Sequence, residues 1–267
     1  MTGRRRLDAE LVRRGLVPSR EAARALVLGG KVTVAGAPAP KPARLVSASE
    51  PIEVAGPPPR FVSRGGDKLD AALDRFGIDV AGRRALDAGA STGGFTDCLL
   101  QRGAAGVTAV DVGYGQLHER LRSDRRVRVL ERTNIRHFTA EVPFDVVVAD
   151  LSFISLSTAA PSLVGDNAAP GADVVVLVKP QFEAGRAEVS RGRGVVRDPA
   201  VWRRALVEVG AALGRRGAAM MGAMVSPLRG PEGNVEFLVH LRAHAAGPPE
   251  PAVDLDSVVD AARDLVP

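Results

Sequence analysis

The larger part of the chain alternates short, continuously apolar runs with segments of helical spacing. The apolar runs lie at residues 85–88, 107–110, 144–149 and 174–178, and the helical segments at 69–76, 95–99 and 199–217. Continuous apolar runs are typical of strands covered on both faces, as in a parallel sheet. The pattern predicts a doubly wound α/β domain with helices on both faces of the sheet. Two further strands are expected at 218–228 and 234–243.

The first quarter of the chain follows another pattern, two short helices and then short strands. Leu7 and Leu11 share one helical face, and Ser19 is placed to cap a second helix that ends at Gly29 and Gly30. Residues 31–36 and 46–54 then alternate with period two. We expect a small α+β unit here.

A proline-rich segment at residues 55–60 marks the boundary between these two regions. The expected organisation is a first domain, a short linker, a large α/β domain, and a Pro-rich linker with a C-terminal helix. The corresponding ranges are 1–59, 60–63, 64–246 and 247–267.

The turn after the first apolar run has the composition of a nucleoside-binding site. Residues 85–88 run into a glycine-rich turn at 89–94, and the next apolar run ends at Asp111. Glycines let a ligand press against bare backbone, and an acid at the end of the next strand can accept hydrogen bonds from ribose hydroxyls. Asp150 and Lys179 follow later apolar runs in the same way. Ligands in such sheets bind outside the carboxyl ends of the strands, so these side chains are expected to meet.

The turn favours S-adenosylmethionine (SAM) over a dinucleotide. The G-x-G-x-x-G fingerprint needs a glycine at Ser91, because the middle glycine lets the pyrophosphate approach. Asp87, just before the turn, would repel a pyrophosphate but suits a cationic amino-acid end. SAM carries such an end and no phosphate.

Positive charge is concentrated at the start of the chain. Residues 1–64 hold ten Arg and two Lys against five acids, a net charge of +7, whereas the whole chain carries +5. A basic segment beside a nearly neutral body favours a polyanion-binding appendage. A solvated, arginine-rich surface without a ligand is the alternative.

The remaining composition argues against several classes of protein. No apolar run is long enough to span a membrane, and the basic N-terminus lacks the apolar stretch of a secretory signal. A single cysteine, Cys98, excludes an internal disulfide, and the four histidines show no metal-ligand spacing. We expect a cytoplasmic protein that binds no metal.

Four charged residues far apart in the chain form a candidate catalytic set: Lys68, Asp150, Lys179 and Glu236. A ribose 2′-hydroxyl must lose its proton as it attacks a methyl donor, and a lysine can accept it if burial and a nearby cation lower its pKa. Two carboxylates would orient the two lysines and balance their charge. In the alternative interpretation, Glu236 faces solvent on an edge strand and Lys68 is an ordinary helix-surface lysine.

The N-terminal unit resembles the S4 RNA-binding domain. The similarity rests on Arg20, Ala23, Leu26, Val27, Gly30, Val32, Val34 and Gly36. This resemblance implies a face that binds structured RNA through its backbone. The basic residues expected on it are Arg4, Arg5, Arg6, Arg13, Arg14, Arg20, Arg24, Lys31 and Arg64.

The order K…DxGxxxGGF…D…D…K…E resembles the FtsJ-like 2′-O-ribose methyltransferases. Together with the S4-like unit, the segments SRGGDKL, LDAGASTGGFTDCLL, DLSFISL, VKPQFE and GNVEF are similar to the TlyA (hemolysin A) family of ribosomal RNA methyltransferases. The resemblance covers about residues 4–243. It implies a Rossmann-like class I methyltransferase sheet and methylation of cytidine ribose in 16S or 23S ribosomal RNA, or in both.

The resemblance also implies roles for particular residues. Lys179 becomes the base, Asp150 and Glu236 orient, and Lys68 holds the substrate. Contacts to SAM are expected from Asp87, Gly89, Ala90, Ser91, Thr92, Gly93, Gly94, Phe95, Asp111, Val112, Asn134 and Ile135. Apart from the resemblance, Phe153 is a candidate for stacking on a flipped base, with packing as the more common alternative. The loop residues Arg186, Arg191, Arg193 and Arg197 are candidates for a second RNA contact, with a solvated loop as the alternative.

Two other functions compete with this one. The first is an RNA-binding or ribosome-assembly protein with a vestigial SAM site, which the complete K-D-K-E order disfavours. The second is a membrane-lytic protein, which the family's hemolysin name invites. The acidic composition of the expected tail helix is unlike that of basic lytic helices.

Overall fold

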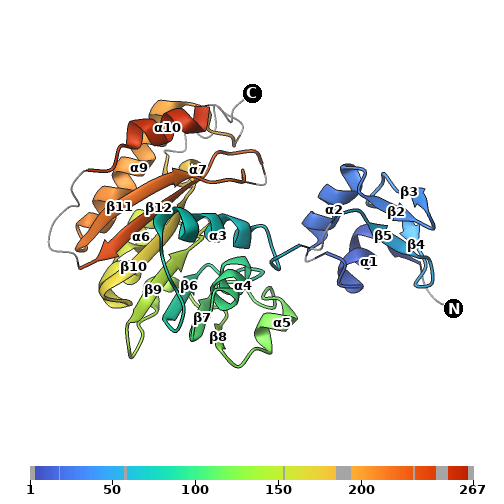
Figure 1. Cartoon of the computed structure of the whole chain (residues 1–267), viewed down its shortest axis with the longest axis horizontal. Coiled ribbons are helices and arrows are strands. Elements are labelled where there is room, and N and C mark those ends of the chain that lie inside the picture. The colour runs from blue at the N-terminus through green and yellow to red at the C-terminus, as the bar shows by residue number, and fades with distance from the viewer. Residues whose placement is uncertain are drawn as a thin grey trace. The chain divides into compact units, whose positions relative to one another are not determined.

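The structure is a computed structural model. It describes residues 4–17, 19–56, 59–152, 154–184, 194–230, 232–244 and 252–263. The chain divides into two compact units, Met1–Arg64 and Gly65–Pro267. Figure 1 shows the strands and helices of each unit.

The smaller unit packs two helices against short antiparallel strands. Helices α1 (Leu7–Arg13) and α2 (Arg20–Leu28) contact each other, and the Ser19 side chain caps α2 by accepting a hydrogen bond from the Ala22 amide. The strands are β1 (Arg5–Arg6), β2 (Val32–Val34), β3 (Ala37–Pro38), β4 (Leu45–Val46) and β5 (Ile52–Val54). They pair as β3-β2-β5 and as β1-β4.

The apolar positions predicted for this unit form its core. Leu7, Leu11, Val27, Val32 and Val34 are buried together. The expectation of one alternating strand over residues 46–54 was wrong. A turn at residues 47–51 separates β4 from β5, and the Ser47 amide in it donates to the Glu50 carboxylate.

The larger unit is built on a seven-stranded sheet of the order β11-β12-β10-β9-β6-β7-β8. Its strands are β6 (Arg84–Ala88), β7 (Gly106–Val110), β8 (Val127–Leu130), β9 (Phe144–Ala149), β10 (Ala168–Val178), β11 (Ala218–Val225) and β12 (Phe237–Ala243). Neighbouring strands from β10 to β8 are parallel, whereas β12 is antiparallel to both β10 and β11. The predicted doubly wound α/β fold is confirmed.

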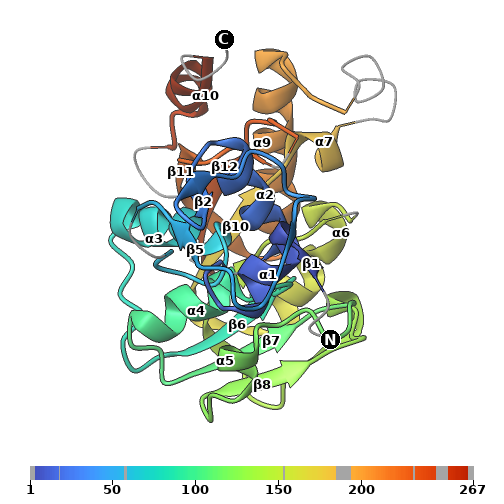
Figure 2. The same cartoon turned by 90° about the vertical axis from the view of Figure 1, so that its right-hand side faces the viewer.

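Helices cover both faces of this sheet (Figure 2). They are α3 (Gly65–Phe76), α4 (Gly94–Gln101), α5 (Glu119–Arg122), α6 (Leu156–Ala160), α7 (Pro180–Glu183), α9 (Pro199–Gly214) and α10 (Leu255–Arg263), with the 3₁₀ turn η1 (Ile135–His137) and the π-helical segment η2 (Pro161–Asp166). Every residue of β10 from Ala172 to Val178 is buried, as expected for a strand with no solvent-facing side.

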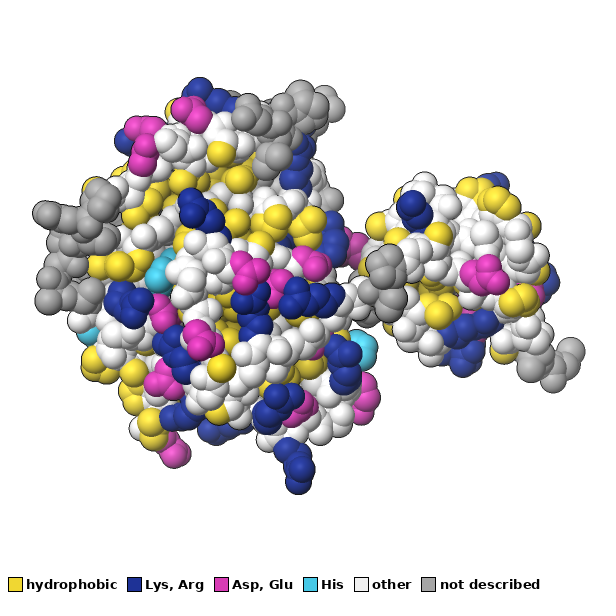
Figure 3. Space-filling view, in the orientation of Figure 1, with side chains coloured by type: hydrophobic (Ala, Val, Ile, Leu, Met, Phe, Trp, Pro, Cys, Tyr) yellow, Lys and Arg dark blue, Asp and Glu magenta, His cyan; other side chains and the backbone are white. Residues whose placement is uncertain are grey.

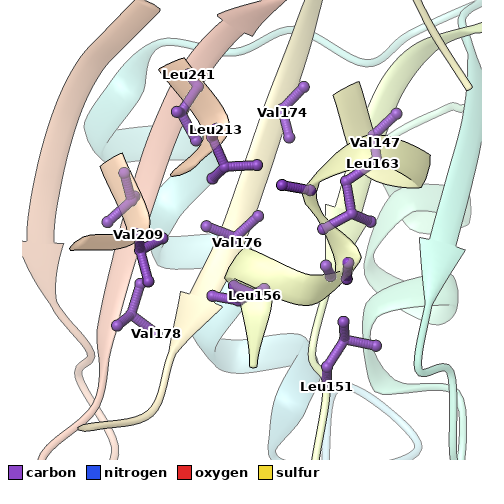
Figure 4. Packing of buried hydrophobic residues seen from close by; sticks show 14 of the residues in the cluster. Val147, Leu151, Leu156, Leu163, Val174, Val176, Val178, Val209, Leu213 and Leu241 are labelled. Carbon is purple, nitrogen blue, oxygen red and sulfur yellow. The ribbon is translucent and has the colours of Figure 1, made fainter. Parts of the chain in front are cut away.

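One face of the sheet carries the largest apolar cluster. Val174, Val176 and Val178 point toward Val209 and Leu213 of α9, and Val147 lies near Leu163 of η2 (Figure 4). Asp198 caps α9 by accepting from the Ala200 amide, and Pro199 occupies the first position of the helix, as predicted. None of the helices that the structure describes combines the length and apolar character needed to cross a bilayer.

Candidate active site

The carboxyl ends of four neighbouring parallel strands bring the predicted polar residues to one edge of the sheet. Asp87 is the next-to-last residue of β6, whereas Asp111, Asp150 and Lys179 directly follow β7, β9 and β10. These strands are consecutive in the sheet order β10-β9-β6-β7, so their ends meet at the same edge. The sheet register therefore assembles residues that are up to 92 positions apart, Asp87 and Lys179, in the sequence.

The glycine-rich turn between β6 and α4 has a shape that side chains would prevent. Gly89 has φ +85°, and a Cβ atom there would lie 2.4 Å from the Asp150 carbonyl oxygen. Gly93 has φ +100°, and a Cβ atom would lie 2.3 Å from Leu121 Cδ1. Ser91 adopts φ +48° without being a glycine, and its amide donates to Asp111 Oδ2 at 2.8 Å. The hydrogen bond from the Ser91 amide thus fixes the backbone of the turn next to the Asp111 carboxylate.

A cavity of about 490 Å³ opens beside this turn. Of the residues that sequence analysis predicted for the cofactor, Gly89, Ser91, Asp111, Val112, Asn134 and Ile135 line it. Ala90 lines a smaller neighbouring pocket. Asp87, Gly93, Gly94 and Phe95 are not in its lining; Asp87, Gly94 and Phe95 are buried beneath the turn and in the first turn of α4. Thr92 is partly buried, and its carbonyl accepts from the His118 amide.

The cavity is acidic. Asp111 and Asp150 are the charged residues among those that line it, and no Lys, Arg or His lies in the described lining. Asp111 is fixed by two backbone donors, the Ser91 amide at 2.8 Å and the Gly113 amide at 2.7 Å. A carboxylate has room for further hydrogen bonds, so Asp111 can still accept from ligand hydroxyls. Such a lining repels phosphate and favours a neutral or cationic ligand.

Asp87 is a fully buried carboxyl that lacks one of its partners. Thr96 Oγ1 donates to Asp87 Oδ2 at 2.6 Å, whereas Oδ1 has no hydrogen-bond partner in the described part of the chain. Burial, together with the neighbouring carboxylates Asp150 and Asp111, raises the pKa of Asp87 to about 7, although the hydrogen bond from Thr96 acts to lower it. An orphaned buried oxygen of this kind is suited to a donor that arrives with a ligand.

Lys179 is held by two groups from the segment after β9. Its Nζ atom lies 2.5 Å from Asp150 Oδ1 and donates to Ser152 Oγ at 3.0 Å. Asp150 and Ser152 both line the cavity. The Lys179 side chain is nearly buried, so the carboxylate supplies the charge partner that burial demands.

Lys68 and Glu236 form a second buried ion pair. Lys68 Nζ lies 2.5 Å from Glu236 Oε2, and the two residues are 8% and 2% exposed. The interpretation of Glu236 as a solvent-facing residue of an edge strand, with Lys68 on a helix surface, was therefore wrong. β12 is an interior strand, because β11 covers its outer side.

The strand register brings the two ion pairs together. Val178 of β10 is opposite Phe237 of β12 in an antiparallel pair. Lys179 follows Val178 and Glu236 precedes Phe237, so these two residues are the next opposite positions along the same pair. Opposite residues in antiparallel strands have Cβ atoms about 5 Å apart. All four members of the predicted set thus lie at the carboxyl edge of the sheet.

Several lining residues were missed by sequence analysis. They are Val110, Gly113, Gln116, Thr133, Leu151, Ser152 and Ile154. Ser152 had a signal, because it lies two residues after Asp150 in DLSF. Gln116 and Thr133 had none, since the loops after β7 and β8 bring them to the cavity without a spacing rule. Phe153, Arg186, Arg191 and Arg193 lie outside the described residues, and Arg197 is exposed.

In the smaller unit, two buried acids form ion pairs with several of the arginines that were predicted to bind RNA. Asp8 accepts from Arg6 at 2.8 Å and from Arg20 at 3.3 Å. Glu10 accepts from Arg13 and Arg14, and these guanidinium groups lower the pKa of Glu10 to about 2.

Arg14 also donates to three backbone carbonyls, those of Ser47, Ala48 and Glu50. It is the least exposed of the arginines paired with Glu10, at 20% of its side chain. Arg14 therefore has a structural role within the unit, because it ties α1 to the turn between β4 and β5.

The other predicted cations of this unit are more accessible. Arg4 pairs with Glu50 and Arg64 with Glu21 at the surface. Arg5, Arg24 and Lys31 are exposed and take part in no ion pair within the described residues. Figure 3 shows Lys and Arg side chains on the surface of each unit. In the part of the chain covered by the structure, no group of three His, Cys, Asp or Glu side chains is arranged to hold a metal ion.

Comparisons with known proteins match both units. Residues 61–243 match the FtsJ-like methyltransferase family and residues 5–52 the S4 domain. A protein from Mycobacterium tuberculosis named 16S/23S rRNA (cytidine-2′-O)-methyltransferase TlyA is 54% identical over 246 residues, which is 91% of each chain. Hemolysin A from Brachyspira hyodysenteriae is 39% identical over 88% of this chain and 98% of its own.

A solved structure gives the same picture. A Streptococcus thermophilus protein described as a candidate hemolysin superposes with a TM-score of 0.80 at 37% identity, covering 99% of this chain and 98% of that one.

The buried Asp87 carboxyl predicts how stability depends on pH. Its pKa of about 7 in the folded protein lies above its ordinary 3.8, so the folded state binds the proton more tightly than the unfolded state. The resulting stabilisation is complete below about pH 4 and is lost as the pH rises through about 7, by at most about 4 kcal/mol. In Asp87→Asn this loss should disappear, because the amide is neutral at every pH.

Urea unfolding of the ligand-free protein at pH 5.5 and pH 8.5 measures the effect. Wild type should lose more stability between the two values than Asp87→Asn does. Equal losses of stability in the two proteins would contradict a raised pKa for Asp87.

Proposed function

The chain belongs to the TlyA family of FtsJ-like methyltransferases, and from this premise we propose that it transfers a methyl group from SAM to a ribose 2′-hydroxyl of ribosomal RNA. The nucleotide is cytidine, in 16S or 23S ribosomal RNA or in both, as the name of the M. tuberculosis relative states for that protein. One observation carries the proposal: two lysine–carboxylate pairs lie at the carboxyl edge of the sheet, and Asp150 of one pair lines an acidic cavity.

The residues around the cavity fit SAM. Gly89 leaves bare backbone beside Asp150, Asp111 offers a fixed carboxylate for ribose hydroxyls, and Asp87 Oδ1 lacks a donor that an amino group can supply. Asn134 and Ile135 are assigned to the adenine end, since they follow β8 and line the same cavity. The acidic lining disfavours a dinucleotide, whose pyrophosphate it would repel.

Bound SAM supplies a methyl group on a positively charged sulfur, and the chain supplies the means to deprotonate the attacking hydroxyl. We assign Lys179 as the base. A neutral amine has two N–H donors and one lone pair, and Asp150 and Ser152 can occupy both donors. The lone pair of the amine is then the one position that remains free. It accepts the 2′-hydroxyl proton as the ribose oxygen forms its new bond to the methyl carbon.

The second pair holds the substrate. Lys68 donates to the ribose or to its phosphate, while Glu236 fixes the direction of the ammonium group and balances its charge. Because both residues are buried, their side chains have little freedom to move, and they hold the substrate in one position. The S4-like unit contributes affinity for folded RNA through Arg5, Arg24 and Lys31, which are exposed.

Transfer from labelled SAM to isolated ribosomal subunits tests the function as a whole. Mapping of 2′-O-methyl groups on ribosomal RNA, with and without the protein, should show a new methylated cytidine. RNA binding with no incorporated label would instead favour a non-catalytic ribosome-assembly factor.

Lys179→Ala should reduce methyl transfer by about 10²- to 10⁴-fold, the range for loss of a general base. Affinity for SAM, measured by calorimetry, should change little, because Lys179 does not line the cavity. Ser152→Ala, which keeps the amine but removes one of its partners, should show a smaller loss. Full turnover in Lys179→Ala would remove this residue from the role of base.

Gly89→Ala should abolish SAM binding. The added methyl group would lie 2.4 Å from the Asp150 carbonyl oxygen, and φ +85° is unfavourable for alanine. Gly115→Ala is a matched control, because this glycine also has positive φ but no atom lies within 4 Å of the added carbon. Calorimetric titration with SAM should lose its signal in the first variant and keep it in the second.

The double variant Arg24→Ala, Lys31→Ala should weaken binding to ribosomal RNA by about tenfold at moderate salt. The slope of log affinity against log salt should fall by about 0.7–0.9 for each phosphate that the variant no longer neutralises. Arg216→Ala removes an exposed arginine of the larger unit and serves as the control. An unchanged salt slope in the double variant would exclude these two residues from the RNA-binding surface.

A further inference from the structure

The carboxylate of Glu236 is confined on two sides. Its Oε2 atom lies 2.5 Å from Lys68 Nζ. On the other side, the Oε1 atom faces the backbone of Gly230, where a Cβ atom would lie 2.6 Å from Oε1 and 3.3 Å from Cδ. No Cβ atom tolerates the first distance, so any side chain at residue 230 requires the carboxylate to move.

Backbone conformation does not explain why a glycine is found at residue 230. The φ angle of Gly230 lies outside the left-handed region, so a positive φ is not the reason for a glycine at this position. Gly233 in the same turn is the opposite case, with φ +90° and no atom within 4 Å of an added Cβ. Gly233 is needed for the backbone conformation of the turn, whereas Gly230 leaves room for the Glu236 carboxylate.

The turn itself is anchored and cannot easily retreat. The Gly230 amide donates to the Asn234 carbonyl at 2.9 Å, and the Gly233 amide donates to the Gly230 carbonyl at 2.9 Å. Asn234 is 1% exposed, and its side chain accepts from the Val196 amide and donates to the Gly194 carbonyl, both at 2.9 Å. A clash at residue 230 is therefore relieved by the Glu236 side chain rather than by the backbone.

We propose that Gly230 is a positioning residue for the reaction, because its missing side chain keeps the Glu236 carboxylate in place against Lys68. The inference rests on the proposed function, in which Lys68 and Glu236 hold the substrate. Gly230 acts through Glu236 and contacts no reacting atom. Asn234 supports it by fixing the turn.

Gly230→Ala should lower the kcat for methyl transfer from labelled SAM to ribosomal subunits by about 10- to 100-fold, with the Kd for SAM unchanged. Gly214→Ala is the matched control, since its added carbon has no atom within 4 Å, and its turnover should equal that of wild type. In Gly230→Ala with Glu236→Asp, the shorter acid should restore part of the lost activity.

A double-mutant cycle isolates the contact. If Gly230→Ala acts through Glu236, then adding it to Glu236→Ala should cost no further activity. A further loss in the double variant would mean that the backbone of the turn is responsible and would overturn the proposal. If Gly230→Ala alone does not fold, the pair Gly230→Ala, Glu236→Ala should fold, because the carboxylate is gone; failure of both to fold would also overturn it.

The outcomes separate this inference from the proposed function. Full activity in Lys68→Ala and Glu236→Ala would remove the buried pair from the reaction and overturn the inference about Gly230, whereas a wild-type protein that transfers no methyl group would contradict the proposed function. Impaired activity in those two variants, with full activity in Gly230→Ala, would overturn the inference about Gly230 and leave the proposed function standing.

Discussion

The structure depends on the cost of burying lysine side chains at the edge of a sheet. An ammonium group taken out of water needs a carboxylate partner, and breaking such a buried pair costs about 3–5 kcal/mol. Lys68 and Lys179 each obtain this partner from another element, Glu236 on the approach to β12 and Asp150 after β9. The pairs therefore tie α3 to β12 and β10 to β9. The same contacts that make burial tolerable also fix the directions of the two amines, so stability and chemistry place the same demand on these residues.

The cavity that Asp150 lines owes its shape and charge to missing side chains as well as to the side chains around it. Gly89 has no side chain, so the backbone is bare beside Asp150. Positive side chains are missing from the described lining, and Asp111 points both carboxylate oxygens at backbone amides. Asp87 lies beneath, buried and lacking one partner. Together these features select for a ligand with hydroxyl and amino groups and against one with phosphates, before any contact with RNA is considered.

The smaller unit shows how a basic segment divides its charge between structure and recognition. Asp8 and Glu10 are buried, and ion pairs with arginines balance their charge. Arg14 pairs with Glu10 and also donates hydrogen bonds to backbone carbonyls of the turn between β4 and β5. Arg24 and Lys31 take no part in that network, so their charge is available to a polyanion. A net charge of +7 over residues 1–64 thus overstates the number of cations that can contact RNA.

Periodicity and local chemistry in the sequence were sufficient to predict the α/β class, the strand ends that carry Asp111, Asp150 and Lys179, and the caps at Ser19 and Asp198, because each depends on residues close together in the chain. They could not decide between a buried and a solvent-facing Glu236, since a strand's place in a sheet depends on which strands flank it. Only the tertiary structure settled this, by inserting β12 between β10 and β11. It also brought Gln116 and Thr133 to the cavity and Gly230 to Glu236, contacts created by loops whose paths no local spacing determines.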